Sequence, residues 1–195
     1  MAKADVSQRE DVEAMMEFVT NEFGRLDVVV SNAASGGFRP LSANSDGHFD
    51  AAMHTNARAL MILVQSALPL LRRQEGRAKV IAISSHGSHR ALPLYGSIGA
   101  SKAALEALIR QFALELSNEG INFNTVLAGV VETDSTRRLP GAEQIFDAAR
   151  HRMMVGGRPL LPNDVAAVVS VLAGPGADMV QGATVVVDGG EGIGP

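Results

Sequence analysis

The stretch LDVVVSNAASGG, residues 26–37, is a short apolar run that ends in small and polar residues. It is too short for a helix and rich in valine, so it predicts a buried strand that leads into a loop. A second run of this kind, KVIAISS at residues 79–85, follows a helical pattern over residues 49–71. Strands that alternate with helices in this way predict a parallel sheet covered by helices.

The remaining segments continue the alternation. Before the first strand, Ser7 and Glu10 form a capping-box pattern that starts a helix, and Gly24 ends it. The later expected elements are a helix over residues 101–116, a strand over 121–129, a short helix around 145–150, a helix capped by Asn163, and a strand over 183–190. We therefore expect one domain over residues 1–195, an α/β protein with three layers. Residues 132–162 are the least regular, and we expect them to act as a substrate lid.

Composition excludes several classes of function. The 195 residues carry a net charge of only -4 with scattered basic residues, which argues against a nucleic-acid partner. No apolar run is long enough to cross a bilayer, and the first residues, MAKADVSQRED, are too polar for a signal peptide. Without cysteine, and with five histidines outside ligand spacing, a metal site is not expected. The sequence favours a soluble, cytoplasmic protein without membrane, nucleic-acid or metal partners.

Each expected strand ends in small or polar residues: SNAASGG, SSHGS, AGVVETD and DGG. In open parallel sheets, ligands bind outside the carboxyl ends of the strands, so these four ends would gather along one rim. Loop-forming residues after any strand would look similar. The pattern alone therefore gives only weak support for a binding site.

Motifs along nearly the whole chain resemble the short-chain dehydrogenase/reductase family. They are ADV, GRLDVVVSNAASG, HTNARAL, VIAISSHGS, YGSIGASKAALEAL, AGVVETD and VVVDGG. Within that family, NAASG, the pair Arg39 and Pro40, SSHGSHR and the spacing of Tyr95 and Lys102 are most similar to the third type of bacterial enoyl-acyl carrier protein reductase. This resemblance implies reduction of the carbon-carbon double bond of an acyl thioester in fatty acid synthesis. The implied cofactor is NADPH, with NADH as the alternative.

The spacing of the tyrosine and the lysine fits this chemistry. Family members that reduce ketones carry a tyrosine four residues before the lysine, a position that Ile98 occupies here and cannot fill as a donor. In enoyl reduction the negative charge develops on the thioester oxygen, further from the nicotinamide, so a more distant donor fits. Seven residues of helix span roughly 10 Å and return to nearly the same face. However, Gly96 and Gly99 suggest that the helix begins only after Tyr95.

The resemblance implies a role for each residue of the reacting centre. The Tyr95 hydroxyl would bind the substrate carbonyl and stabilise or protonate the enolate, while Lys102 would hold the nicotinamide ribose and lower the pKa of the tyrosine. Asn56 matches an asparagine that supports the lysine through a water. Ser84 and Ser85 both lie where the family places a substrate-binding serine, and the sequence does not decide between them. Without the family pattern, a packing tyrosine and a surface lysine would be the ordinary interpretation.

The resemblance also implies contacts to the cofactor. The implied residues are Asp5 and Val6 at the adenine, Asn32, Ala33 and Ala34 on the adenosine side, Ser84 and Lys102 near the nicotinamide, and Gly129, Val130 and Thr133 at the nicotinamide amide and phosphates. Two residues depart from the family pattern, since Ala34 replaces a glycine and Ala128 a proline. His86 and His89 lie close to this rim, where loop histidines are more common than an acid or base.

The glycine-rich turn with which the family begins is missing, because no GxxxGxG occurs before Asp5. The ADV motif corresponds to the end of the family's third strand. We therefore expect an N-terminally truncated Rossmann-like fold with weak binding of the cofactor phosphates. The strand in residues 26–37 would then form an open edge that pairs with another chain or aggregates.

Three functions remain open on the sequence alone. The first is an enoyl reductase that acts on an acyl thioester of acyl carrier protein or coenzyme A. The second is a related ketoreductase or dehydrogenase, which Ile98 disfavours. The third is a shortened, non-catalytic binding module that has lost its cofactor. In all three, the helices around residues 49–71 and 101–116 match those through which family members form dimers or tetramers.

Overall fold

The computed structural model describes residues 3–155 and 157–193, and its centre is a parallel sheet of four strands. The strands follow one another in chain order across the sheet, β1-β2-β3-β4. They are β1 (Val28–Ser31), β2 (Ala78–Ser85), β3 (Ile121–Ala128) and β4 (Thr184–Val187). Because every neighbouring pair is parallel, all four carboxyl ends lie along one rim of the sheet.

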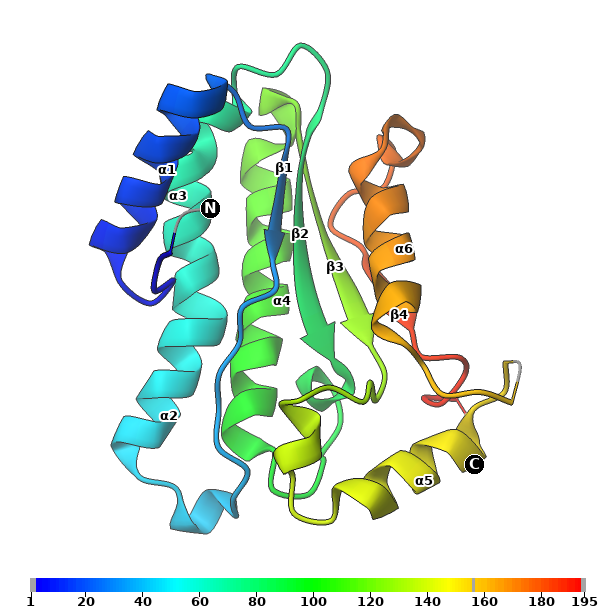
Figure 1. The fold of residues 1–195 in the computed structure, drawn as a ribbon. Helices are drawn as coiled ribbons and strands as arrows, with labels where there is room; N and C mark the ends of the chain where they lie inside the picture. Colours follow the sequence, from blue (N-terminus) through cyan, green and yellow to red (C-terminus); the bar gives the residue numbers. More distant parts are fainter. Residues whose placement is uncertain (1–2, 156, 194–195) are drawn as a thin grey trace.

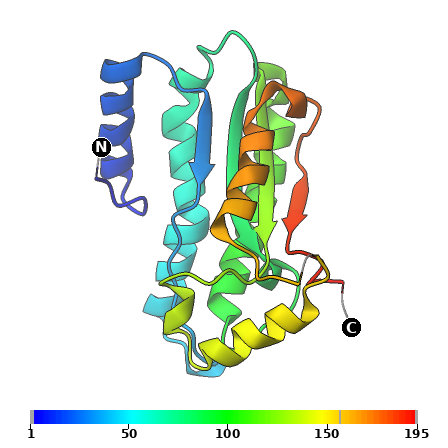
Figure 2. The same ribbon diagram turned by 45° about the vertical axis from the view of Figure 1, so that its right-hand side comes forward.

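Helices cover both faces of this sheet, as Figures 1 and 2 show. On one face lie α1 (Arg9–Phe23), α2 (Asp46–Met53), α3 (Ala59–Leu71) and α4 (Gly96–Leu116), and on the other α6 (Pro162–Ala173). The short helix α5 (Ala142–Arg152) lies across the carboxyl ends of the strands (Figure 1). The predicted three-layer α/β architecture is confirmed.

Short 3-10 turns connect several of these elements. They span Leu41–Ala43, His86–Ser88, Ser117–Glu119, Thr136–Arg138 and Pro175–Ala177. One π-helical turn, His54–Arg58, joins α2 to α3 without a break in the helical path. The helix predicted over residues 49–71 is therefore present and begins slightly earlier, where Ser45 accepts a hydrogen bond from the His48 N–H at its first turn.

Two apolar clusters hold the layers together. The larger one lies between the sheet and α1, α3 and α4, with Leu60, Ile109 and Phe123 fully buried. The smaller one lies under α6 and includes Ile81 and Val126. Burial of each such side chain stabilises the fold by about 1.5–3 kcal/mol. Strands β2 and β3 face apolar layers on both sides, which explains their continuous apolar runs.

The first helix begins differently from the prediction. Gln8, not Ser7, occupies the N-cap position of α1. The Ser7 hydroxyl donates instead to the Asp5 carboxylate, 2.8 Å away, so it does not cap the helix. At the other end the prediction is confirmed, because Gly24 adopts the left-handed conformation with φ 71°.

Two other helices begin at residues other than those given from the sequence. Helix α6 begins at Pro162 with Leu161 at its N-cap, so Asn163 lies inside the first turn. There the Asp164 carboxylate accepts a hydrogen bond from the Leu161 N–H at 2.8 Å. Helix α4 begins at Gly96, five residues before the predicted start, because its glycine-containing first turn is helical as well.

Strand β1 lies at one edge of the sheet and, within the part of the chain that the structure describes, pairs only with β2. The side chain of Val30 on this strand is 43% exposed. Within the described residues, the strand's edge therefore presents both unpaired backbone groups and apolar surface.

None of the described helices combines the length and apolar character that crossing a membrane requires.

Candidate active site

The carboxyl end of β2 and the start of α4 bring the predicted tyrosine and serine together. The hydroxyl oxygen of Tyr95 lies 3.1 Å from the Oγ of Ser85, the last residue of β2. Tyr95 occupies the N-cap position of α4, outside the helix, with ψ 9°. The expectation that the helix begins after Tyr95 is confirmed. Tyr95 and Lys102 are thus separated by slightly less than two helical turns, with the tyrosine placed by the preceding loop.

That loop is conformationally constrained. Leu94, directly before Tyr95, has φ 61° and is the sole non-glycine residue of the described part with a positive φ. A leucine in this left-handed conformation costs of order 1 kcal/mol, a kind of strain that clusters at functional sites. The Leu94 carbonyl accepts a hydrogen bond from the Arg39 N–H at 3.0 Å, which helps to hold the conformation.

Two glycines let the tyrosine ring and the loop of Gly87 pack closely together. A Cβ on Gly87 would lie 2.4 Å from a ring carbon of Tyr95, and one on Gly99 would lie 2.6 Å from the Gly87 carbonyl oxygen. On another side, the ring of Phe38 lies 5.8 Å from that of Tyr95, centroid to centroid. Only glycine at position 87 therefore lets the ring approach the loop this closely. The role of Gly87 in the SSHGS motif was not recognised from sequence.

Burial determines the acidity of the tyrosine. It raises the pKa of Tyr95 above the usual value, and the hydrogen bond with Ser85 offsets part of this rise. Lys102 does not contribute to the pKa shift of Tyr95, and its ammonium donates to the Ile83 carbonyl oxygen at 2.7 Å. Tyr95 is therefore a protonated hydrogen-bond donor at neutral pH.

Lys102 lies on the buried face of α4 and is 6% exposed. Burial lowers the pKa of its ammonium to about 8, against an opposing effect of the Glu106 carboxylate. One turn further along α4, Glu106 accepts a hydrogen bond from the Ser84 hydroxyl at 2.5 Å. Ile83 and Ser84, neighbours on β2, therefore bind Lys102 and Glu106, which fixes the helix against the strand. Glu106 was not singled out from sequence, although its spacing of four from Lys102 is a recognisable signal.

Asn56 holds the loop that follows β1. Its side-chain oxygen accepts from the Ser35 N–H and its amide donates to the Ser35 carbonyl, both at 2.8 Å. The same amide donates to the Ser101 hydroxyl on α4 at 2.8 Å. Asn56 belongs to the π-helical turn, a feature frequent at functional sites. Within the described residues it makes no direct hydrogen bond to Lys102, so it positions the loop and the helix.

The predicted cofactor residues fall into separate groups. Gly129, Val130 and Thr133 form the loop after β3, where the Val130 N–H donates to Glu191 and the Thr133 N–H to the Thr136 hydroxyl. Asn32, Ala33 and Ala34 follow β1 and are exposed. Asp5 and Val6 precede α1, and the hydrogen bonds of Asp5 in the described structure are to neighbours near that helix. The loops after β1 and β3 thus lie at the strand-end rim. Asp5 is instead hydrogen-bonded to Ser7 and Asp11, at the start of α1.

The two histidines of SSHGSHR lie near the turn that follows β4, which begins at Asp188. His86 is buried, and its Nε2 lies 2.8 Å from the Asp188 carboxylate, while its Nδ1 lies 3.4 Å from His89. Burial acts to raise the pKa of Asp188, but hydrogen bonds from the Gly190 and Gly192 N–H groups and from His86 outweigh it and lower that pKa. Sequence reasoning missed Asp188 because it is 102 residues from His86. Among the described residues, no group of three His, Asp or Glu could hold a metal.

The hydrogen-bonding capacity of Lys102 at the rim fits a nicotinamide nucleotide. In the described structure, the buried Lys102 ammonium donates one hydrogen bond, to Ile83, whereas an ammonium has three donors. A pair of ribose hydroxyls offers acceptors for the other two. Lys102 and the loops after β1 and β3 are thus the residues that would hold such a cofactor.

Comparison with known proteins identifies relatives of this chain. A family model described as "Enoyl-(Acyl carrier protein) reductase" matches residues 1–191. The chain is 34% identical over 194 residues to 1-cyclohexenylcarbonyl-CoA reductase of Streptomyces collinus, covering 96% of this chain and 66% of that protein. It therefore spans slightly less than two thirds of that relative's length.

Solved structures share the fold. An enoyl-[acyl-carrier-protein] reductase (NADH) from Aquifex aeolicus superposes with a TM-score of 0.90 at 27% identity, covering 98% of this chain and 75% of that one. A gluconate 5-dehydrogenase from Burkholderia cenocepacia, in complex with NADP and tartrate, also gives 0.90, at 26% identity, with 98% and 74% covered. From the family match, the sequence identity and the fold together, the chain belongs to the short-chain dehydrogenase/reductase family.

Proposed function

We propose that the chain reduces the carbon-carbon double bond of an enoyl thioester with hydride from NADPH, or from NADH in its place. The observation that carries the proposal is the half-buried pair of Tyr95 and Ser85 at the strand-end rim, with hydroxyl oxygens 3.1 Å apart. A second feature supports it. Ile98, which stands where ketone-reducing members carry tyrosine, is apolar, 6% exposed and packed against Gly36. Tyr95 is therefore the donor available for an oxyanion at this rim.

The chain's own residues account for the polar part of the reaction. A bound nicotinamide would supply the hydride, which adds to the β carbon of the substrate. The Tyr95 hydroxyl donates a hydrogen bond to the thioester oxygen and stabilises the enolate that forms there, and a proton from solvent then adds to the α carbon to complete the saturated product. Ser85 fixes the direction of that hydroxyl, and Lys102 holds the nucleotide by its ammonium. Because burial keeps Tyr95 protonated, its hydroxyl can donate throughout the neutral range.

The relatives support an acyl thioester as substrate. The proteins from Streptomyces collinus and Aquifex aeolicus are named as reductases of unsaturated acyl groups, one carried on coenzyme A and the other on acyl carrier protein. We propose one of these carriers for the substrate of this chain as well. The gluconate dehydrogenase shows that the same fold also serves a different reaction in the family, so the substrate must be tested directly.

We also propose that the chain works as a homo-oligomer, a dimer or tetramer. Two apolar side chains on the helices expected to form the interface support this, since Phe49 on α2 is 38% exposed and Leu114 on α4 is 75% exposed. Both side chains lie on the helices through which family members assemble, so an interface there would bury them. Light scattering of the purified chain measures the state directly, and a monomer at micromolar concentration would contradict the proposal.

The first experiment titrates the purified chain with NADPH and NADH and follows nucleotide fluorescence. Crotonyl-CoA is then added, and acetoacetyl-CoA serves as the matched ketone substrate. Saturable binding with oxidation of the nucleotide by crotonyl-CoA supports the proposal. Oxidation by acetoacetyl-CoA alone would assign a ketoreductase instead. If a folded chain binds neither nucleotide, the proposed reduction is wrong for this chain and the non-catalytic alternative is favoured.

A further inference from the structure

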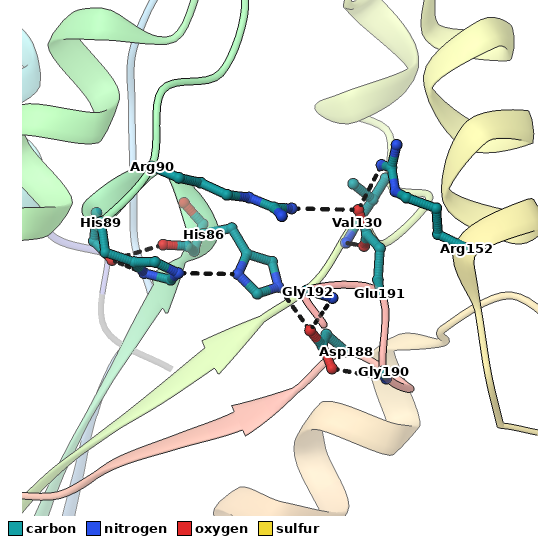
Figure 3. Close-up of polar contacts among 11 residues, drawn as sticks. His86, His89, Arg90, Val130, Arg152, Asp188, Gly190, Glu191 and Gly192 are labelled. Carbon is teal, nitrogen blue, oxygen red and sulfur yellow. Dashed lines mark hydrogen bonds and ion pairs between the residues drawn. The ribbon is translucent and has the colours of Figure 1, made fainter. Parts of the chain in front are cut away.

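Glu191, in the turn that follows β4, is a buried carboxylate that the proposed reaction does not use. It is 1% exposed. Its Oε2 accepts a hydrogen bond from the Val130 N–H at 3.1 Å, and its Oε1 accepts one from Arg152 at 2.9 Å. An Arg90 nitrogen lies 3.7 Å from Oε1. Figure 3 shows these groups converging on the one carboxylate.

The partners of Glu191 belong to three different segments around the candidate active site. Arg90 lies in the loop between β2 and Tyr95, Val130 in the loop after β3, and Arg152 in the last turn of α5. The two arginine side chains are 35% and 40% exposed, so each carries its charge at the protein surface and reaches inward. One buried charge thus connects the tyrosine loop, the proposed cofactor loop and the helix above the rim.

The rest of the same turn fastens α5 in place. The N–H groups of Met154 and Val155, just after α5, both donate to the Gly189 carbonyl, at 2.8 and 3.1 Å. A Cβ on Gly189 would lie 2.0 Å from the Met153 sulfur, so the chain after α5 packs directly on this turn. Asp188 binds His86 in the tyrosine loop, as Figure 3 also shows.

The loop after β3 is built around the carboxylate. A Cβ on Gly129 would lie 2.9 Å from the Glu191 Oε2 and 2.8 Å from the Asp188 Cβ. Position 129 must therefore be glycine for the loop to reach Glu191. Burying a carboxylate without partners would destabilise the fold. The arginines and the Val130 N–H stabilise the buried Glu191, and Glu191 in turn fixes the positions of the segments that carry them.

We propose that Glu191 is a positioning residue, which sets the α5 helix and the loop of Gly129, Val130 and Thr133 at their places over the strand-end rim. This inference rests on the proposed function, because it takes that loop to hold the cofactor and α5, which lies within the predicted substrate lid of residues 132–162, to face the substrate. As a positioning residue, Glu191 is assigned no contact with either reactant. Its loss should therefore weaken the binding of nucleotide and thioester more than it slows the step that Tyr95 assists.

The test compares Glu191→Gln with Glu119→Gln. The control removes an exposed carboxylate from another arginine pair, in which Arg72 lies 2.6 Å from Glu119, and it leaves the rim untouched. Hydrogen exchange of α5 and residues 129–133 is measured without any ligand. We expect exchange there to accelerate about tenfold in Glu191→Gln, as a lost charged hydrogen bond allows local opening, and not in the control.

Kinetics give the second measurement. In Glu191→Gln we expect the Kd of the nucleotide and the KM of the thioester to rise about tenfold, with kcat changed less than threefold. If this variant does not fold, Arg152→Met removes the same contact from the exposed side of α5, and Arg152→Lys should restore part of the protection. Exchange that stays at the wild-type rate in both Glu191→Gln and Arg152→Met would overturn the inference.

The two proposals fail in different ways. If the wild-type chain binds no nucleotide, the proposed function fails, but the exchange experiment still tests whether Glu191 holds α5 and the loop. If the wild type reduces crotonyl-CoA while Glu191→Gln keeps normal exchange and normal KM, the function stands and the role of Glu191 is wrong.

Discussion

The hydroxyl of Tyr95 lies within hydrogen-bond distance of the Ser85 hydroxyl, at 3.1 Å, although ten residues separate them in the chain. The contact joins the last residue of β2 to the residue before α4. It places a protonated phenol at the rim where all the strands end, which is the geometry that an oxyanion donor needs.

Removing this phenol tests its role most directly. We expect Tyr95→Phe to lower the reduction of crotonyl-CoA by about 100-fold or more, the usual effect of a lost acid or oxyanion donor. The Kd of the nucleotide should stay within about twofold, because the phenyl ring still packs between Phe38 and Gly87. Steady-state kinetics and nucleotide titration measure both. Near-normal turnover would show that Tyr95 is only a packing residue.

The two neighbouring serines should behave differently. Ser85→Ala removes the partner of the tyrosine hydroxyl, so we expect kcat to fall roughly tenfold, the equivalent of about 1.4 kcal/mol. The pKa of Tyr95 should also rise further, because the Ser85 hydrogen bond lowers it.

Ser84→Ala instead leaves the Glu106 carboxylate without its partner, which should lower the free energy of unfolding by about 1–3 kcal/mol. Chemical denaturation and the pH dependence of kcat separate the two serines. Equal effects of both variants on kcat, with unchanged stability, would contradict this assignment.

Lys102 should give two opposite responses to pH. Since burial lowers the pKa of its ammonium to about 8, the charge that holds the nucleotide is lost as pH rises through that value, so affinity should fall. For stability the sign is reversed. Between about pH 8 and the unfolded value of 10.5 the unfolded chain binds more protons, so the contribution of Lys102 to stability rises with pH.

Both responses can be measured against Lys102→Met. In this variant the rise in stability above pH 8 that comes from the lysine should disappear. The pH dependence of nucleotide affinity should disappear with it, leaving a uniformly weaker Kd. Denaturation and nucleotide titration over the same pH series provide the comparison. Parallel curves for wild type and variant would show that Lys102 does not titrate in this range.

Space beside the tyrosine ring can also be tested with a single methyl group. In Gly87→Ala the new Cβ would meet the Tyr95 ring, so we expect the ring to shift and kcat to fall about tenfold or more, since misplacement by about 1 Å costs up to 100-fold. Gly76→Ala is the matched control, because no atom lies within 4 Å of its added Cβ. Equal activity of both variants would mean that the ring is free to move.

Much of the fold was predictable from local patterns. The apolar runs predicted β1 to β4, because strands buried on both faces are apolar throughout, and helical spacing predicted α1, α3, α4 and α6. Helix starts were less predictable. Ser7 and Asn163 are good capping residues in isolation, yet the carboxylates of Asp5 and Asp164 form the hydrogen bonds at those turns. Competition between nearby polar groups decides which residue caps a helix, and the sequence does not reveal which group wins.

The sequence by itself determined the family, the parallel sheet and the pairing of Tyr95 with Lys102 as candidate site residues, because these depend on residue types at short spacing. Only the tertiary structure decided that Ser85, and not Ser84, faces the tyrosine, and that burial raises the pKa of Tyr95. It also brought Glu191 to Val130 and Arg152, 61 and 39 residues away. Contacts between the ends of distant elements depend on how the layers pack, and no local pattern of residues encodes that packing.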